Sequence, residues 1–292
     1  MPDRRSHSGS TRRGNPNLAV LLTWLVPGAG HLYLGRAAFG LAAFAVVEGL
    51  YLAGLYLSGG MFLEYLPPEM RGRFAAALTP EVANLGALFW HVERFGYGPG
   101  HPRPWPPAMD LGTTLTAASG VLNLFLMARV HFDARLAAHD ARVAPPIVAP
   151  PIGSGARAGR LGPAGAAFLT WVSPGLGHLA QGRRLRGVLV FVLLVGLFLF
   201  GTWLAQGSNL DRERHFYYWA GQFLLGPPAI LVEFLHGHQR VTGEVPYADG
   251  GVVIASIAGM LNVLCMLDVY GWGEWRLLGE PEPRAGEAEA AA

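Results

Sequence analysis

The residues best suited to chemistry are two histidines, His31 and His178, that follow the same glycine-rich turn. Each comes after a Pro-Gly-x-Gly sequence, whose glycines allow backbone conformations and close contacts that other residues do not. Two such histidines are candidates to hold a metal ion or to relay a proton. The alternative is structural, with each imidazole donating hydrogen bonds to carbonyl groups of the turn. No His-x3-His spacing surrounds either residue, so we expect the structural role, with no metal and no other cofactor.

Polar residues inside apolar segments form a second group of candidates, because an unpaired charge in a membrane is costly. They are Glu48, Asn123, Glu233, Asn262 and Asp268. The two asparagines occupy equivalent places in a repeat, and we expect them to form hydrogen bonds between helices. Asp268 is equivalent to Arg129, and the opposite charges predict either an ion pair between the two copies or two independent interfacial charges.

Motifs of enzymes do not occur. The sequence contains no Gly-rich phosphate loop, no Ser-centred nucleophile elbow and no His-Glu-x-x-His. We therefore expect no catalytic residues, and an enzymatic function is the less favoured interpretation.

The glycine-rich turn belongs to a sequence that occurs twice. Residues 24–36 return at 171–183 without a gap, and residues 110–130 align with 249–269. The repeated turn residues are Pro27, Gly28, Gly30, His31, Gly35 and Arg36 in the first copy, and Pro174, Gly175, Gly177, His178, Gly182 and Arg183 in the second. An ungapped match of this length indicates a duplicated structural unit.

Composition places this unit in a membrane. Of the 292 residues, 51% are hydrophobic and only 14% are charged, and the mean hydropathy is +0.30. These values are typical of a polytopic membrane protein. A net charge of +2 argues against nucleic-acid binding, and the single Cys265 excludes an intramolecular disulfide. The arginines before residue 14 predict a cytoplasmic N-terminus.

The predicted fold is all-α and integral to the membrane, with two tandem repeats. The segments are a disordered basic tail (1–16), repeat A (17–133), a Pro/Arg-rich cytoplasmic linker (134–163), repeat B (164–275) and a disordered acidic tail (276–292). The predicted spans are residues 39–57, 111–130, 188–205 and 252–270. In the first span, Ala45, Gly49 and Ala53 form a stripe of small residues that predicts contact with another helix.

The apolar segment that contains the first turn, Leu18 to Leu34, is marginal for a crossing, which needs about 20 residues. Arg36 and Arg183 directly follow the two turns, and full crossings would place both outside the cell, against the positive-inside tendency. A re-entrant segment, which returns to its starting side, removes this conflict. A kinked segment that crosses fully is the alternative.

These motifs resemble an uncharacterised bacterial membrane-domain family. Its pattern is Pro-Gly-x-Gly-His-x-Tyr-x-Gly-Arg near the start, similar to residues 27–36, and Ala-Gly-x-Leu-Asn followed by Asp near the end, similar to 258–268. A more distant similarity is to the two-transmembrane-helix domain family with a Gly-Ala-His-x-Phe-Tyr-x-Gly turn. Both resemblances imply a membrane architecture, and the closer one implies no established activity.

The function we expect is a non-enzymatic scaffold or interaction subunit of a membrane assembly. The alternative is a small transporter or lipid-handling protein that uses the intramembrane His and Glu residues. Expected partners are membrane lipids, with other membrane proteins or a second copy as further candidates. The expected location is the bacterial inner membrane, with several crossings and with the N-terminus and central linker in the cytoplasm.

Overall fold

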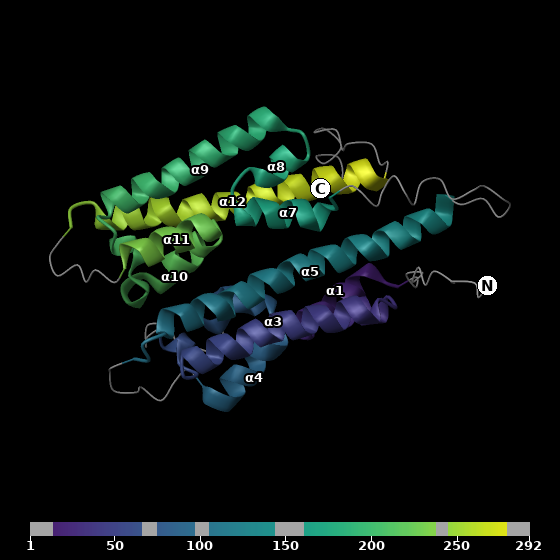
Figure 1. Ribbon diagram of the computed structural model, residues 1–292, viewed down its shortest axis with the longest axis horizontal. Coiled ribbons are helices and arrows are strands. Elements are labelled where there is room, and N and C mark those ends of the chain that lie inside the picture. The colour runs from purple at the N-terminus through teal and green to yellow at the C-terminus, as the bar shows by residue number, and fades with distance from the viewer. Residues whose placement is uncertain (1–13, 66–74, 97–104, 144–160, 238–244, 279–292) are drawn as a thin grey trace, which may run out of the picture. The chain divides into compact units, whose positions relative to one another are not determined.

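A computed structural model describes residues 14–65, 75–96, 105–143, 161–237 and 245–278, and every regular element in these ranges is a helix. The chain divides into two compact units, residues 1–150 and 151–292 (Figure 1). The predicted all-α class and two-part architecture are thus confirmed. The two predicted tails and the middle of the predicted linker lie almost entirely outside the described residues.

The first unit begins with a short helix and a turn. Asn15 caps this helix by accepting hydrogen bonds from the backbone of Asn17 and Leu18, and Pro16 takes the first helical position, where an N–H is not needed. The helices are α1 (Pro16–Leu25), α2 (Ala29–Tyr33), α3 (Ala37–Leu57), α4 (Leu85–Phe95) and α5 (Met109–Val143), with the 3-10 turns η1 (Phe62–Tyr65), η3 (Ala75–Leu78) and η4 (Pro80–Ala83) before α4.

The second unit repeats this order at its two ends. Its elements are α7 (Pro163–Val172), α8 (Leu176–Ala180), α9 (Arg184–Leu204), η5 (Ser208–Leu210), α10 (Arg212–Phe223), α11 (Pro227–His236) and α12 (Ala248–Leu278). Helices α7, α8, α9 and α12 correspond to α1, α2, α3 and α5. Between the long helices the units differ, and this is where the alignment of the two copies changes register.

Four helices are long and apolar enough to cross a membrane: α3, residues 109–139 of α5, α9 and α12. They coincide with the four predicted spans to within a few residues, apart from longer ends on α5 and α12. Helices α1 and α7 have ten residues each, about 15 Å of helix, which is half of the hydrocarbon thickness of about 30 Å. The chain is an integral membrane protein.

The two long helices of each unit run antiparallel and touch through glycine. Figure 1 shows α3 alongside α5, and α9 alongside α12. A Cβ atom on Gly54 would lie 2.5 Å from the carbonyl oxygen of Gly112, and one on Gly201 would lie 2.7 Å from that of Gly251. Small residues at the crossing bring the two backbones into contact.

The contact face of α3 differs from the prediction. Ala45, Gly49 and Ala53 are exposed within the first unit, and a Cβ atom on Gly49 would meet nothing within 4 Å. Tyr51, which is fully buried, and Gly54 pack against the rest of the unit instead. Burial of an aromatic side chain removes more apolar surface from solvent than burial of alanine does. Packing through the face that carries Tyr51 is therefore more favourable than packing through the predicted stripe.

Helix α5 is longer than predicted. It continues to Val143, through residues that the prediction assigned to the linker. Residues 131–143 contain neither glycine nor proline, so nothing in the sequence ends the helix there. Helix α12 likewise continues to Leu278, three residues past the predicted end of repeat B at residue 275.

Candidate functional site

The Pro-Gly-x-Gly-His sequences form tight turns that leave no room for a side chain. After Pro27 and Pro174, the backbone angle φ is 82° at Gly28 and 80° at Gly175, in the left-handed region that glycine adopts most readily. A Cβ atom on Gly28 would lie 2.1 Å from the carbonyl oxygen of Gly40. One on Gly175 would lie 2.0 Å from that of Gly187. This contact explains why both copies carry glycine here.

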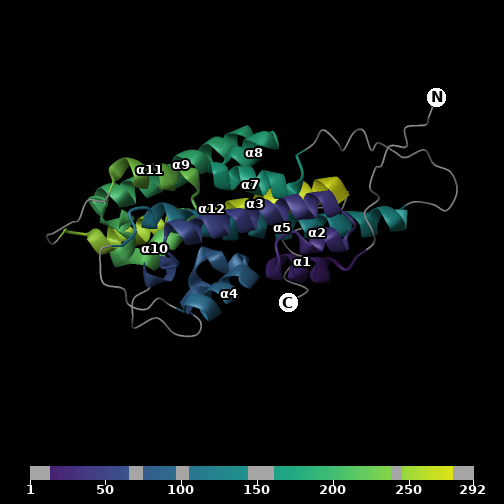
Figure 2. The same cartoon turned by 60° about the horizontal axis from the view of Figure 1, so that its bottom comes forward.

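After each turn the chain doubles back along the helix that it has just left, as the pair α7 and α8 shows in Figure 2. In the first unit a Cβ atom on Gly30 would lie 2.1 Å from the carbonyl oxygen of Ala19. The backbone nitrogen of Asn15 lies 3.1 Å from the hydroxyl of Tyr33, which ends α2. Gly35, with φ of 81°, then leads into α3. In the structure, α1 and α2 thus form a helical hairpin.

The second hairpin is built in the same way. A Cβ atom on Gly177 would lie 2.2 Å from the carbonyl oxygen of Ala166, and Gly182, with φ of 85°, leads into α9. The amide of Gln181 at the end of α8 donates to the carbonyl of Val269, 2.7 Å away. Each hairpin therefore packs against the last helix of its own unit.

The two motif histidines are both fully buried, but their surroundings differ. Nε2 of His178 lies 3.1 Å from Oδ2 of Asp268. His31 packs on the ring of Phe39, with 4.7 Å between centroids, and has no hydrogen-bond partner among the described residues. The predicted hydrogen bonds from these imidazoles to carbonyls of the turn are absent from the described residues. Backbone N–H groups bind such carbonyls instead; the N–H of Arg36, for example, donates to the carbonyl of His31.

Burial also sets the charge of these histidines. It lowers the pKa of His31 to about 4, and the positive charges of Arg36 and Arg129 act in the same direction. Burial and then Arg183 lower the pKa of His178, against the opposing effect of Asp268. Among the residues that the structure describes, no group of three His, Cys, Asp or Glu is placed to hold a metal ion.

Acid is expected to destabilise the protein through its buried histidines. The pKa of His31 is about 4 in the folded chain, compared with 6.5 for a histidine free in water, and burial lowers that of His91 to about 4 as well. Between these pH values the unfolded chain binds more protons than the folded chain does. The stability that comes from keeping these histidines neutral is therefore fully present above about pH 6.5 and is lost as the pH falls toward 4. Melting temperatures in detergent across this range measure the effect. The melting temperature of His31→Gln should fall less steeply with decreasing pH than that of wild type. Equal slopes would contradict the role of buried His31 in this loss of stability.

The arginine after the second turn binds an aspartate on the last helix of its own unit. Nη1 of Arg183 lies 2.7 Å from Oδ2 of Asp268, and Nη2 of Arg186 lies 3.0 Å from Oδ1. Together with His178, three groups that can be positively charged converge on one carboxylate. This cluster joins the end of the hairpin and the start of α9 to α12.

In the first unit the carboxylate has moved by one helical turn. Arg36 forms an ion pair with Asp133, four residues after Arg129, which occupies the place of Asp268. Nε of Arg129 lies 3.9 Å from Oδ2 of Asp133, and its guanidinium carbon lies 4.4 Å from the centroid of Phe39. Arg129 and Asp268 each have a partner inside their own unit, and the ion pair between copies stays a prediction.

The duplicated asparagines form the expected hydrogen bonds between segments. Each side-chain amide donates to two backbone carbonyls, one on the first helix of the unit and one on the segment between the long helices. Asn123 donates to Thr23 and Ala83, at 2.9 and 2.8 Å, and Asn262 to Thr170 and Leu224, at 3.2 and 3.1 Å. One side chain thus joins three parts of each unit.

Asn262→Leu is expected to lower the free energy of unfolding by about 1–3 kcal/mol, because two buried carbonyls lose their donor. Thermal unfolding in detergent measures the loss. Met260→Leu is the control, since Met260 is 59% exposed on the same helix. Equal melting temperatures for the two variants would contradict the role of the asparagine.

Of the two predicted intramembrane glutamates, Glu233 has specific polar partners in the structure. It forms an ion pair with Arg212, whose side chain is only 1% exposed, and accepts a hydrogen bond of 3.0 Å from Nε1 of Trp219. The sequence did not single out Arg212, because it lies in a charged stretch that is typical of a loop. Glu48 is half-buried on α3, within reach of Asn84.

Comparison with known proteins adds a family but no activity. No curated protein and no solved structure matches this chain. A family model described as a family of unknown function, DUF6677, matches residues 18–142 and 165–281. These two segments cover most of the chain and correspond to the two units of the fold. The chain belongs to the family of unknown function DUF6677.

Proposed function

We propose that this protein is a non-enzymatic scaffold or interaction subunit of a membrane assembly. The observation that carries the proposal is the use of the duplicated residues. The glycines of the turn admit a neighbouring backbone, the arginine after it binds an aspartate, and the asparagine joins three segments. The residues retained in both copies thus shape and hold each repeat.

We further propose that each helical hairpin enters and leaves the membrane on one side, the cytoplasmic side of a bacterial inner membrane. Helices α1 and α7 are too short to cross, and the chain doubles back after each. Two antiparallel spans per repeat then return the chain to its starting side, so the basic N-terminus and the central linker share the cytoplasm.

Lipids and protein partners would contact the spanning helices that are least covered by the rest of their own unit. In the apolar windows of α3 and α9, only 28% and 22% of the residues are buried. On α9, Leu193 is 65% exposed and Trp203 is 73% exposed. Such apolar faces fit hydrocarbon chains, helices of other membrane proteins or a second copy.

Mass spectrometry of the full chain, extracted in native-membrane particles, tests the scaffold proposal. We expect a protein partner at fixed stoichiometry that is lost in Leu193→Ala and kept in Met260→Ala, an exposed position on α12. Melting temperatures show that both variants fold. Retention of a lipid, a solute or a metal without a protein partner would contradict the scaffold role.

A small transporter or lipid-handling role is the second candidate, and one groove favours it. This open groove in the second unit has a volume of about 600 Å³ and a mainly apolar lining that includes Leu199, Trp203, Leu204, His236 and Tyr247. It suits an acyl chain better than a polar solute. A lipid retained in the same experiment, and lost in Trp203→Ala, would support this role.

A further inference from the structure

The two repeats form equivalent hydrogen bonds from side chains to backbone carbonyls around their interiors. Nε1 of Trp24 donates to the carbonyl of Val82, and that of Trp171 to the carbonyl of Phe223. One of the two carbonyls that each duplicated asparagine binds belongs to the next residue: Ala83 for Asn123 and Leu224 for Asn262. Residues near 82 and near 223 therefore occupy the same place in the two units, although the sequence alignment fails there.

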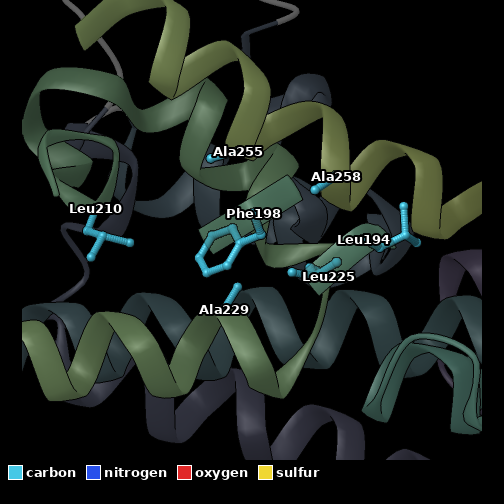
Figure 3. Packing of buried hydrophobic residues seen from close by; sticks show 7 residues of the cluster. All are labelled: Leu194, Phe198, Leu210, Leu225, Ala229, Ala255 and Ala258. Atoms are coloured by element: carbon cyan, nitrogen blue, oxygen red, sulfur yellow. The ribbon is translucent and has the colours of Figure 1, made fainter. Parts of the chain in front are cut away.

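These equivalences show that the interiors differ in chemistry. The second unit has an apolar core at this place, which Figure 3 shows with Phe198, Leu225, Ala255 and Ala258 pointing inward. The first unit has polar side chains at the matching positions, all at most 2% exposed. The pairs, with the first unit given first, are Tyr51 and Phe198, Glu81 and Gln222, Asn84 and Leu225, Thr116 and Ala255, and Ser119 and Ala258.

The polar side chains of the first unit form one cluster, defined by Tyr51, Glu81, Asn84, His91 and Thr116. Oγ1 of Thr116 donates to Oε1 of Glu81, 2.7 Å away. The rings of Tyr51 and His91 lie edge to face, with 6.5 Å between centroids. Asn84 is fully buried, and neither its oxygen nor its nitrogen has a hydrogen-bond partner of ordinary geometry among the described residues.

The cluster reaches the outside of the unit through a second carboxylate. Tyr51 is close enough to Glu81 and to Glu48 for its hydroxyl to interact electrostatically with both. Glu48 is half-buried one turn before Tyr51 on α3 and lies within reach of Asn84. Among the described residues, Tyr51 of α3 thus interacts with both Glu81 and Glu48, His91 of α4 lies against Tyr51, and Thr116 of α5 contributes its hydroxyl to Glu81.

The fold itself does not need this cluster. Buried polar groups are costly, and more so inside a membrane. The second unit builds the same helix arrangement with Phe, Leu and Ala at four of the five matching positions, and opposite Glu81 it has the neutral Gln222, which hydrogen-bonds to Asn209. The polar set of the first unit is therefore extra to its folding. An acid, an imidazole and hydroxyls in one buried place are suited to gain and lose a proton.

We propose that the interior of the first repeat is a proton-binding site centred on Glu81. In the proton-free state the carboxylate of Glu81 accepts the hydrogen bond of Thr116. On protonation one carboxylate oxygen takes a proton that enters past Glu48, and the new O–H donates within the cluster. The second repeat is the structural copy that lacks this site. This assignment goes beyond the scaffold role, because it gives the first repeat a ligand of its own.

Infrared difference spectra of the full chain in lipid, recorded between high and low pH, test the site. A buried carboxylic acid gives a C=O stretching band that is separate from those of exposed carboxyls. We expect such a band in wild type, its loss in Glu81→Gln and its retention in Glu93→Gln, an exposed control on α4. Glu81→Gln copies Gln222 of the second repeat, so it should fold. A band unchanged in Glu81→Gln would overturn the proposal.

A second variant keeps the test decisive if Glu81→Gln does not fold. Thr116→Ala copies Ala255 and removes the donor to the charged carboxylate, so the midpoint of the band should move to higher pH. An unchanged band and midpoint in Thr116→Ala would also overturn the proposal. If sodium abolishes the wild-type band at constant pH, the ligand is a monovalent cation, and the proton assignment is wrong.

Discussion

Gly175→Ala is expected to destabilise the second repeat by about 2–5 kcal/mol. A left-handed conformation costs an alanine roughly 1–2 kcal/mol, and φ at Gly175 is 80°. Overpacking adds about 1–3 kcal/mol, because the new Cβ atom would lie 2.0 Å from the carbonyl oxygen of Gly187. Chemical unfolding in mixed micelles measures the loss. Gly28→Ala should have the same effect in the first repeat.

Two other glycines of the second unit serve as controls that separate the cost of the left-handed backbone from the cost of the steric contact. Gly182 has φ of 85° but no neighbour within 4 Å of its Cβ position, so Gly182→Ala should cost only the strain. Gly196 has neither feature, and Gly196→Ala should leave stability unchanged or slightly higher. If Gly175→Ala is no worse than Gly182→Ala, the backbone contact does not hold the turn.

Asp268→Asn is expected to lower the free energy of unfolding of the second repeat by about 1–3 kcal/mol. Arg183, Arg186 and His178 all lose the charge on which they converge. The loss stays below that of a fully buried pair because Asp268 is 31% exposed and solvent screens its charge. The same unfolding measurement detects it. Without the carboxylate the pKa of His178 should fall further, since Asp268 acts to raise it.

The arrangement of the first repeat supplies the matched rescue. Asp268→Arg places an arginine where Arg129 stands, and Trp272→Asp then places a carboxylate one turn later, as at Asp133. The single change should destabilise, and the double change should recover part of the loss. A double variant no more stable than Asp268→Arg would show that the position of the carboxylate, and not its charge alone, controls this contact.

The sequence predicted the features that repeat with fixed spacing. The four spans follow from uninterrupted apolar length, and the turn follows from two copies of Pro-Gly-x-Gly-His that align without a gap. The hydrogen bonds of Asn123 and Asn262 were expected because a polar residue in an apolar helix needs a partner. These inferences depend on local composition, which the chain itself displays.

Features set by tertiary contact could not be predicted in this way. Asp133 pairs with Arg36 one turn after Arg129, the residue equivalent to Asp268, so the repeat alone did not show which residue binds Arg36. Glu81 and His91 lie in the segment where the copies no longer align. The equivalence of residues 81–84 to residues 222–225 of the second unit emerges only from hydrogen bonds such as those of Trp24 to Val82 and Trp171 to Phe223.

We propose that each hairpin returns to its starting side of the membrane before the first crossing of its repeat. It is tested most directly by labelling single cysteines with an impermeant reagent in a Cys265→Ser background. Three exposed residues mark the path: Asn17 at the start of the hairpin, Ala37 directly after it, and Tyr56 at the far end of α3. We predict that Asn17→Cys and Ala37→Cys are labelled from the same side and Tyr56→Cys from the opposite side. Labelling of Asn17→Cys and Ala37→Cys from opposite sides would contradict the account.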